Sequence, residues 1–130
     1  MNAIHNPKSI SAPLGRYSHG VKVPKNAEWL YIAGQLGVKP DGTTAAGIAA
    51  QCETAWQNVG AILADAGMGF EDLVKVNIYL TNPEHTGASR EARDKALAGV
   101  KNPPAATLVI ITQLVKPEYL VEIEACAAKA

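Results

Sequence analysis

The chain has 130 residues, the usual size of one domain, and it is long enough to bury a core without disulfides or metals. Its 12 basic and 12 acidic residues cancel, so it has no broad electrostatic reason to bind nucleic acid or an anionic membrane. We expect a single domain over residues 1–130, which opens with an irregular arm over residues 1–15, where Pro7, Pro13 and Gly15 interrupt any regular pattern.

The first residues have neither the charged segment nor the apolar core of a signal peptide. No apolar run approaches the length of a membrane span, so we expect a cytoplasmic protein. Cys52 and Cys126 have apolar neighbours and are expected to be free thiols rather than a disulfide. His5, His19 and His85 are far apart in sequence, and no His/Cys cluster has the spacing of a metal site.

Two segments with β character come next. Residues 17–23 alternate, which would place Tyr17 and His19 on one face of a strand. Residues 29–36 are rich in apolar and β-forming side chains, and the turn between the two segments predicts a hairpin. Gly34 interrupts the second strand, which indicates a bulge or the close approach of another group to the backbone.

The middle of the chain predicts a helix, a strand and a second helix. Apolar residues recur at helical spacing over residues 45–66, with Thr43 or Thr44 as the cap. Residues 73–81 alternate as a strand with one apolar face. An Asn-Pro pair then opens a helix that we expect over residues 82–98.

The last part of the chain predicts two strands. Residues 106–111 are a near-continuous apolar run, as in a strand buried on both faces, and residues 119–127 alternate so that Glu122 and Glu124 share one face. The element order ββ-α-β-α-ββ predicts an α/β (α+β) fold, in which two helices cover one face of a mixed sheet. The other face needs a cover, and a second copy of the chain is the simplest source, so we expect a homo-oligomer.

Glu122 is the first candidate for chemistry, because it is a carboxylate between Val121 and Ile123 in a strand that should be buried. If it lines an enclosed pocket, the loss of water raises its pKa and suits it to proton transfer or to activating water. The alternative is a solvent-facing carboxylate, since Glu124 lies on the same face.

Other candidates lie elsewhere along the chain. Tyr17 offers a phenol and His19 a group that exchanges protons near neutral pH, although aromatic packing and simple exposure explain them equally well. Arg90 and Arg93 lie three residues apart on the second helix and could hold a carboxylate, or could belong to a solvated surface. Cys126 has no neighbour that would lower its pKa, which favours a packing role.

The order and spacing of several motifs resemble the RidA/YjgF family over about residues 8–128. No single motif is diagnostic, but the set is specific when taken together. The segments that carry the resemblance are Gly15-Arg-Tyr17-Ser-His19-Gly20, Ala33-Gly34-Gln35, Asp72-Leu-Val-Lys-Val-Asn-Ile-Tyr-Leu, Pro104-Ala-Ala-Thr-Leu-Val and Tyr119-Leu-Val-Glu122-Ile-Glu124-Ala.

The resemblance implies a chorismate-mutase-like fold, a homotrimer, and clefts between adjacent subunits. Members of the family hydrolyse reactive enamines and imines, release ammonia and a 2-keto acid, and use no metal or bound cofactor. The resemblance therefore implies a hydrolase or deaminase that acts on a small molecule and needs no cofactor. Family names also include endoribonuclease and translation inhibitor, which a chain of zero net charge does little to support.

Carried over residue by residue, the resemblance implies that Tyr17 helps to orient substrate and that Glu122 positions or activates water. It also implies that the backbone of Gly34 lines the cleft. The arginine that binds the substrate carboxylate in the family falls at Ala106 here, and the pocket cysteine falls at Leu108.

These two departures bear on the substrate. Ala106 cannot hold a carboxylate, and losing a buried arginine–carboxylate contact costs about 2–5 kcal/mol of binding. Arg90 or Arg93 replaces that arginine if either turns into the cleft; otherwise the pocket favours a less anionic ligand than 2-aminoacrylate. The family's pocket asparagine falls near Ser89 or Arg90. A trimer that binds a metabolite without turning it over is the alternative to an enzyme, and a ribonuclease ranks last.

Overall fold

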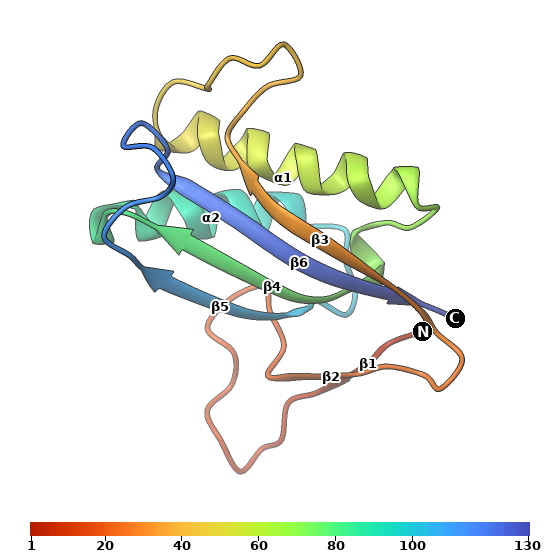
Figure 1. Cartoon of the computed structure of the whole chain (residues 1–130). Helices are drawn as coiled ribbons and strands as arrows, with labels where there is room; N and C mark the ends of the chain where they lie inside the picture. The colour runs from red at the N-terminus through yellow and green to blue at the C-terminus, as the bar shows by residue number, and fades with distance from the viewer.

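The computed structural model describes residues 1–130. Two helices and six strands follow one another in the chain, together with two short 3₁₀ turns (Figure 1). Their bounds are β1 Ala3–His5, β2 Gly20–Lys22, β3 Glu28–Leu36, α1 Ile48–Asp65, a 3₁₀ turn Phe70–Asp72, β4 Leu73–Leu80, a 3₁₀ turn Pro83–His85, α2 Thr86–Ala96, β5 Ala105–Ile110 and β6 Val121–Lys129.

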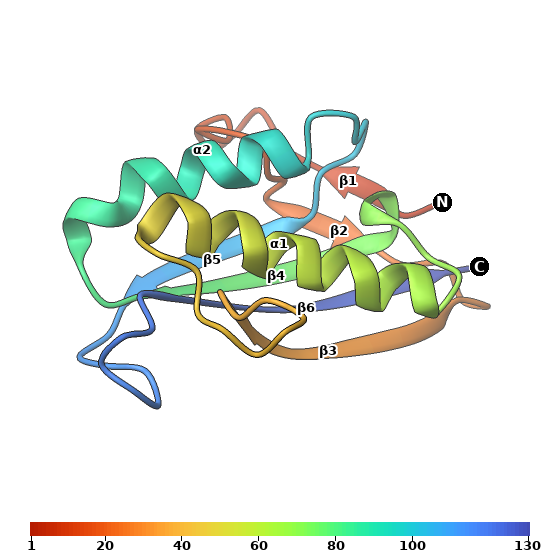
Figure 2. The same cartoon turned by 90° about the horizontal axis from the view of Figure 1, so that it is seen from above.

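The main sheet has the strand order β3-β6-β4-β5. Its pairs are antiparallel except for β4 and β5, which run parallel and are joined by a crossover through α2. Both helices lie along the same face of this sheet (Figures 1 and 2). The expected fold class, a mixed sheet with two helices on one face, is therefore confirmed.

The N-terminal part differs from the prediction. Residues 3–5 form β1 inside the arm expected to be irregular, and β1 pairs antiparallel with β2. Because β2 is so short, Tyr17 and His19 lie in the loop before it rather than on a strand. The predicted hairpin is wrong, since β3 pairs with β6 instead. A period of two identifies a strand but not its partner, and β6 is the partner whose nine residues match the length of β3.

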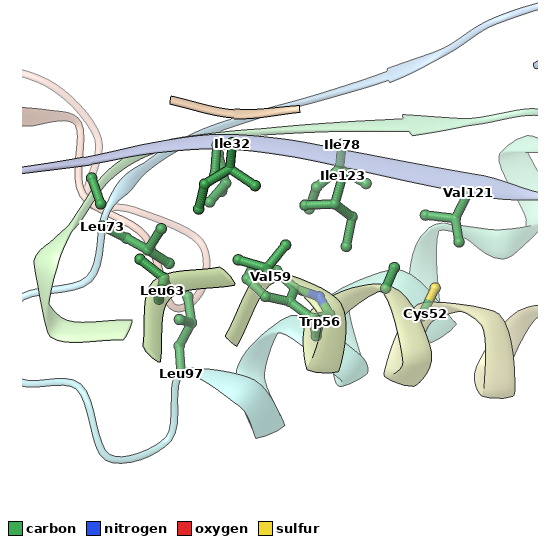
Figure 3. Packing of buried hydrophobic residues seen from close by; sticks show 14 of the residues in the cluster. Ile32, Cys52, Trp56, Val59, Leu63, Leu73, Ile78, Leu97, Val121 and Ile123 are labelled. Atoms are coloured by element: carbon green, nitrogen blue, oxygen red, sulfur yellow. The ribbon is translucent and has the colours of Figure 1, made fainter. Parts of the chain in front are cut away.

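The core lies between the helices and the sheet and contains a cluster of 16 buried residues. Figure 3 shows Val59 and Leu63 of α1 directed toward Ile78 and Ile123 of the sheet. Alternate residues of β6 enter this core, and those between them lie on the opposite face. This alternation is what places Glu122 on the face of the sheet that carries no helix.

That helix-free face, called the open face below, is partly exposed in the single chain. Tyr31 and Trp29 of β3 are 79% and 49% exposed, and their rings stack with centroids 6.2 Å apart. Val109 of β5 is 42% exposed, so the prediction that this strand is buried on both faces is wrong for one chain. β5 is an edge strand with β4 as its only long partner, and nothing within the chain covers its outward side chains.

The helix ends follow local chemistry. α1 begins after Gly47, whose φ of 85° is in the left-handed region, and not after a threonine cap. Thr43 is engaged elsewhere, because its hydroxyl donates to Asp41 Oδ1 at 2.7 Å and closes a turn. Asn82 accepts a hydrogen bond at 2.9 Å from a backbone N–H two residues on, which confirms the predicted helix start, although the first turn, Pro83–His85, is 3₁₀.

Candidate functional site

A broad cavity of about 600 Å³, which is widely open to solvent in the single chain, lies on the open face beside the segment that connects β5 to β6. It is placed where β4 and β6 run side by side, with Tyr79 directly opposite Glu122 in the register. The connecting segment supplies its other wall. The residues that line it are Tyr79, Ile111, Gln113, Leu114, Val115, Glu122 and Glu124.

The two carboxylates in this cavity have different surroundings. Glu124 Oε1 accepts hydrogen bonds from the Tyr79 hydroxyl at 2.5 Å and from Asn77 Nδ2 at 3.2 Å. The hydrogen bond to Glu124, together with burial and the negative charges of both glutamates, raises the pKa of Tyr79. No side chain of the chain makes a hydrogen bond or an ion pair with Glu122, so that carboxylate is free to contact a ligand or water.

The lack of a side chain at Gly34 leaves room for the Glu122 side chain. The β3–β6 register shifts between Ile32 and Gln35, which is a bulge around the glycine, as the sequence indicates. A Cβ atom at position 34 would lie 2.7 Å from Glu122 Cδ. The prediction that the glycine marks a bulge or a close approach is therefore confirmed on both counts, and the backbone at Gly34 lies beside the carboxylate.

Two amides that sequence reasoning missed hold the chain around this cavity. Gln51 is 3% exposed, and its side chain donates to Glu118 O at 3.0 Å and accepts from Leu120 N at 2.9 Å. It therefore fixes the chain just before Glu122. Asn58 donates to the carbonyls at the end of β3, at 2.9 Å to Val38 O. A polar residue within an otherwise apolar helix stripe was the available signal for Gln51.

Tyr17 and His19 form a second group, close to α2. Their rings meet edge to face with centroids 6.0 Å apart, and the Arg93 guanidinium lies 5.6 Å from the centre of the Tyr17 ring. The tyrosine hydroxyl accepts from Leu14 N at 3.2 Å. The loop that carries both residues is tied to the start of β5, where Ser18 N donates to a carbonyl at 2.9 Å.

Arg93 belongs to this second group, whereas Arg90 does not. Arg93 is 8% exposed and pairs with Asp94 at 3.1 Å, and a Cβ atom on Gly15 would lie 2.3 Å from its Nη2. Arg90 is exposed. The two arginines therefore differ in burial, because the loop before β2 covers Arg93 alone.

Ala106 and Leu108 face the helices. They stand opposite Val76 and Ile78 in the β4–β5 register and pack against the core. Within one chain the structure thus brings Gly34 together with Glu122 on the open face. It brings a different set together beside α2, namely Tyr17, His19 and Arg93. It does not bring these two groups to one place.

Other parts of the molecule contain fewer groups suited to catalysis or ligand binding. A second cavity of about 490 Å³ lies between α1 and α2, and its rim carries the Lys95–Glu53 ion pair at 3.8 Å but none of the candidate residues. No group of three or more His, Cys, Asp and Glu side chains is close enough to hold a metal ion.

Both cysteines are free, as expected, and burial raises the pKa of Cys52 to about 11. None of the helices is long and apolar enough to cross a membrane.

Comparison with known proteins finds relatives that match nearly the whole chain. Residues 8–129 match the family model described as Endoribonuclease L-PSP. The chain is 35% identical over 130 residues to a RutC family protein of Aquifex aeolicus, covering 99% of this chain and 100% of that one. It is 31% identical over 120 residues to a rat protein named 2-iminobutanoate/2-iminopropanoate deaminase, covering 91% of this chain and 83% of the rat protein.

Solved structures agree with the sequence matches. The crystal structure of YyfB, a Rid family protein of unknown function from Yersinia pestis, superposes with a TM-score of 0.88 at 27% identity over 98% of both chains. RidA from an Antarctic Psychrobacter superposes with a TM-score of 0.72 at 34% identity over 89% of this chain and 90% of that one. The chain therefore belongs to the RidA/YjgF family, the family whose model is named Endoribonuclease L-PSP.

Proposed function

We propose that this protein hydrolyses the C=N bond of small reactive imines, including those formed by tautomerisation of enamines, at the cavity that contains Glu122. The observation that carries the proposal is an unpartnered carboxylate, Glu122, at the wall of a cavity of about 600 Å³ and beside the bare backbone of Gly34. The name of the rat relative, an imine deaminase, supports the same class of reaction. Membership of the family alone would not select this reaction.

The reaction requires few catalytic groups from the protein. Glu122 takes a proton from a water molecule while the water oxygen attacks the carbon of the C=N bond. The resulting carbinolamine breaks its C–N bond once the nitrogen has gained a proton, so ammonia leaves and a carbonyl remains. A carboxylate with no partner inside the chain is suited to both proton transfers, because no existing hydrogen bond has to break.

We propose further that the protein works as a homotrimer whose sites form between copies. Tyr31, Trp29 and Val109 leave apolar surface on the open face, and a second copy would cover it. A second copy would also join the Glu122 group of one chain to the Tyr17 group of another, which no single chain does. The number three comes from the family resemblance. Light scattering should give three times the chain mass of 13.7 kDa, and a stable monomer at micromolar concentration would contradict the assembly.

The substrate is proposed to differ from 2-aminoacrylate. Ala106 packs toward the helices and has no group for a carboxylate. Arg93 is the only buried arginine of the two candidates, but in its own chain it lies against Tyr17 and pairs with Asp94. An anionic end of a substrate would therefore have to be held by Arg93 across a subunit boundary, or not at all.

The test is ammonia release from two kinds of imine generated in the assay: imines that carry a carboxylate, made by an amino-acid oxidase, and imines that carry none, made by a flavin amine oxidase. The wild-type protein should accelerate release, and Glu122→Gln should lower the acceleration by about a hundredfold or more, as for loss of a general base. Glu118→Gln is the matched control, because Glu118 is exposed and only its backbone carbonyl, bonded to Gln51, contributes to the fold. Equal rates for wild type and Glu122→Gln would refute the proposal.

A non-catalytic trimer that binds a small metabolite is the second candidate. It is favoured by the apolar Ala106 and Leu108, which pack against the core at positions where the family resemblance implies polar pocket residues. Saturable binding without turnover, and thermal stabilisation lost in Glu122→Gln, would support it over the enzyme. A ribonuclease is the remote alternative, which the family name suggests. RNA cleavage that survives repurification and disappears in Glu122→Gln would revive it.

A further inference from the structure

The side chains around the Glu122 cavity offer hydrogen-bond acceptors almost exclusively. Two carboxylates and a phenol oxygen line it, and the Gln113 amide is the only side chain with an N–H group; the remaining lining residues are aliphatic. No lysine, arginine or histidine lines the cavity. Lys75, which lies on the same face, donates to Thr107 Oγ1 at 2.7 Å and is not part of the lining.

The Tyr79 hydroxyl is held in one orientation. Its single hydrogen is given to Glu124 Oε1, so only its oxygen lone pairs remain for the cavity. Asn77 donates to the same carboxylate oxygen and keeps Glu124 in place. Tyr79 lies opposite Glu122 in the register, and both residues line the cavity.

We infer that this cavity selects the nitrogen end of its ligand as a cationic N–H donor, a protonated imine or an ammonium group, and that Tyr79, oriented by Glu124, is a specificity-determining residue for it. The inference rests on the proposed function, because it names the ionic form of the substrate at that same site. An N–H group would donate to Glu122 and to the Tyr79 oxygen at once. On the part of the site that one chain supplies, a carboxylate would meet only like charge and unshared acceptors.

The inference has a chemical consequence. A protonated C=N bond is far more electrophilic at carbon than a neutral one, so a cavity that favours the cation also favours attack by water. Substrates whose only charge is the iminium nitrogen need no partner for an anionic end, which agrees with the absence of a basic group from the part of the lining that one chain supplies.

The test compares three probes of nearly the same shape: benzamidine, which is a stable cation with N–H donors, benzamide, which is neutral, and benzoate, which is an anion. Binding to the full-length wild-type protein is followed by isothermal titration and by NMR shifts. Benzamidine should bind at least about tenfold more tightly than benzamide, and benzoate should be the weakest, as a charge-assisted hydrogen bond requires. Benzoate binding as tightly as benzamidine would overturn the inference.

Variants distinguish the contribution of Tyr79 to probe binding from that of the rest of the site. Tyr79→Phe should weaken benzamidine binding by about threefold to tenfold and benzamide binding by less, because a neutral amide N–H makes a weaker hydrogen bond than a cationic one. Tyr31→Phe makes the same change on the same sheet face but outside the cavity lining, and it should leave all three probes unchanged. Glu124→Gln, which keeps the shape of the side chain, should have part of the effect of Tyr79→Phe. If Tyr79→Phe leaves the preference for benzamidine intact, the inference is wrong.

The two proposals fail in different ways. If ammonia release depends on Glu122 while benzamidine shows no preference, the hydrolase stands and the inference falls. If benzamidine is preferred through Tyr79 and Glu122 while no imine is turned over, the inference stands and the protein is a binding module. Thermal unfolding of every variant shows whether a loss of binding comes from a loss of fold.

Discussion

Gly34 and Glu122 fit together so closely that a methyl group on the first would overlap the second. A Cβ atom at position 34 would lie 2.7 Å from Glu122 Cδ and 2.9 Å from Cγ and Oε2. The bulge in β3 brings the two residues together across the β3–β6 pair. The glycine therefore sets where the carboxylate lies in the cavity.

Gly34→Ala should displace the Glu122 side chain and lower imine hydrolysis by about tenfold or more. The free energy of unfolding should fall by no more than about 1–3 kcal/mol. The contact is with a flexible side chain, which moves aside more readily than backbone does. Gly87→Ala is the matched control, because Gly87 lies in α2 with open space around it, and it should raise stability by about 0.5–1 kcal/mol. Unchanged activity in Gly34→Ala would show that the position of the carboxylate is unimportant.

Gln51→Ala should lower the free energy of unfolding by about 2–3 kcal/mol. The change removes two hydrogen bonds from a residue 3% exposed and leaves Leu120 N and Glu118 O without their partner. Gln57→Ala, on the exposed side of the same helix, should stay within about 0.5 kcal/mol. Urea unfolding of both variants measures the difference, and equal stabilities would mean that Gln51 does not anchor the chain before β6.

Arg93→Ala should cost about 1–2 kcal/mol, because the side chain is 10% exposed and covers the Tyr17 ring. The pair with Asp94 adds little, since Asp94 is 41% exposed. Arg90→Ala removes an exposed arginine from the same helix and should change stability by less than about 0.5 kcal/mol. A Tyr17 fluorescence or NMR signal that stays the same in Arg93→Ala would argue against the contact.

Much of the fold could be predicted from the sequence, because periods of 2 and 3.6 residues record which side of an element is buried. The alternation around Val121 and Ile123 correctly puts Glu122 on the other face of β6. Partners of strands were harder, since a pattern does not say which strand lies beside it. Asn2, just before β1, donates from its side chain to Ala128 O at 3.1 Å, a contact between the two ends of the chain that no local pattern predicts.

The candidate site could be predicted only in part. The contact between Gly34 and Glu122 follows from two sequence features, a glycine within one strand and a carboxylate within another. The separation of Tyr17 from Glu122 does not, because it depends on the loop before β2 and on α2, which no local pattern relates to β6. The roles of Tyr79 and Asn77 were missed, although both lie on the polar side of β4, where cross-strand pairing with Glu124 is possible.

Tyr79 should titrate above its ordinary value of 10.0, because the hydrogen bond to Glu124 and the nearby glutamates favour its neutral form. The folded state then holds that proton more tightly than the unfolded state, so stability is present below pH 10 and falls as the pH rises through the folded pKa. Glu124→Gln should bring the pKa of Tyr79 back toward the ordinary value. Tyrosinate absorbance of wild type minus Tyr79→Phe isolates this residue, and an unshifted titration would contradict the hydrogen bond.

The central claim is that one chain supplies two half-sites, with Glu122 in one and Tyr17 in the other, and that neighbouring copies join them. Glu122→Gln and Tyr17→Ala proteins, each inactive alone, are unfolded together in equal amounts, refolded and assayed for ammonia release from imines. In a cyclic assembly where each site takes Glu122 from one copy and Tyr17 from its neighbour, random mixing should restore about a quarter of the wild-type rate. No restoration, with mixed oligomers confirmed by native mass spectrometry, would contradict the claim.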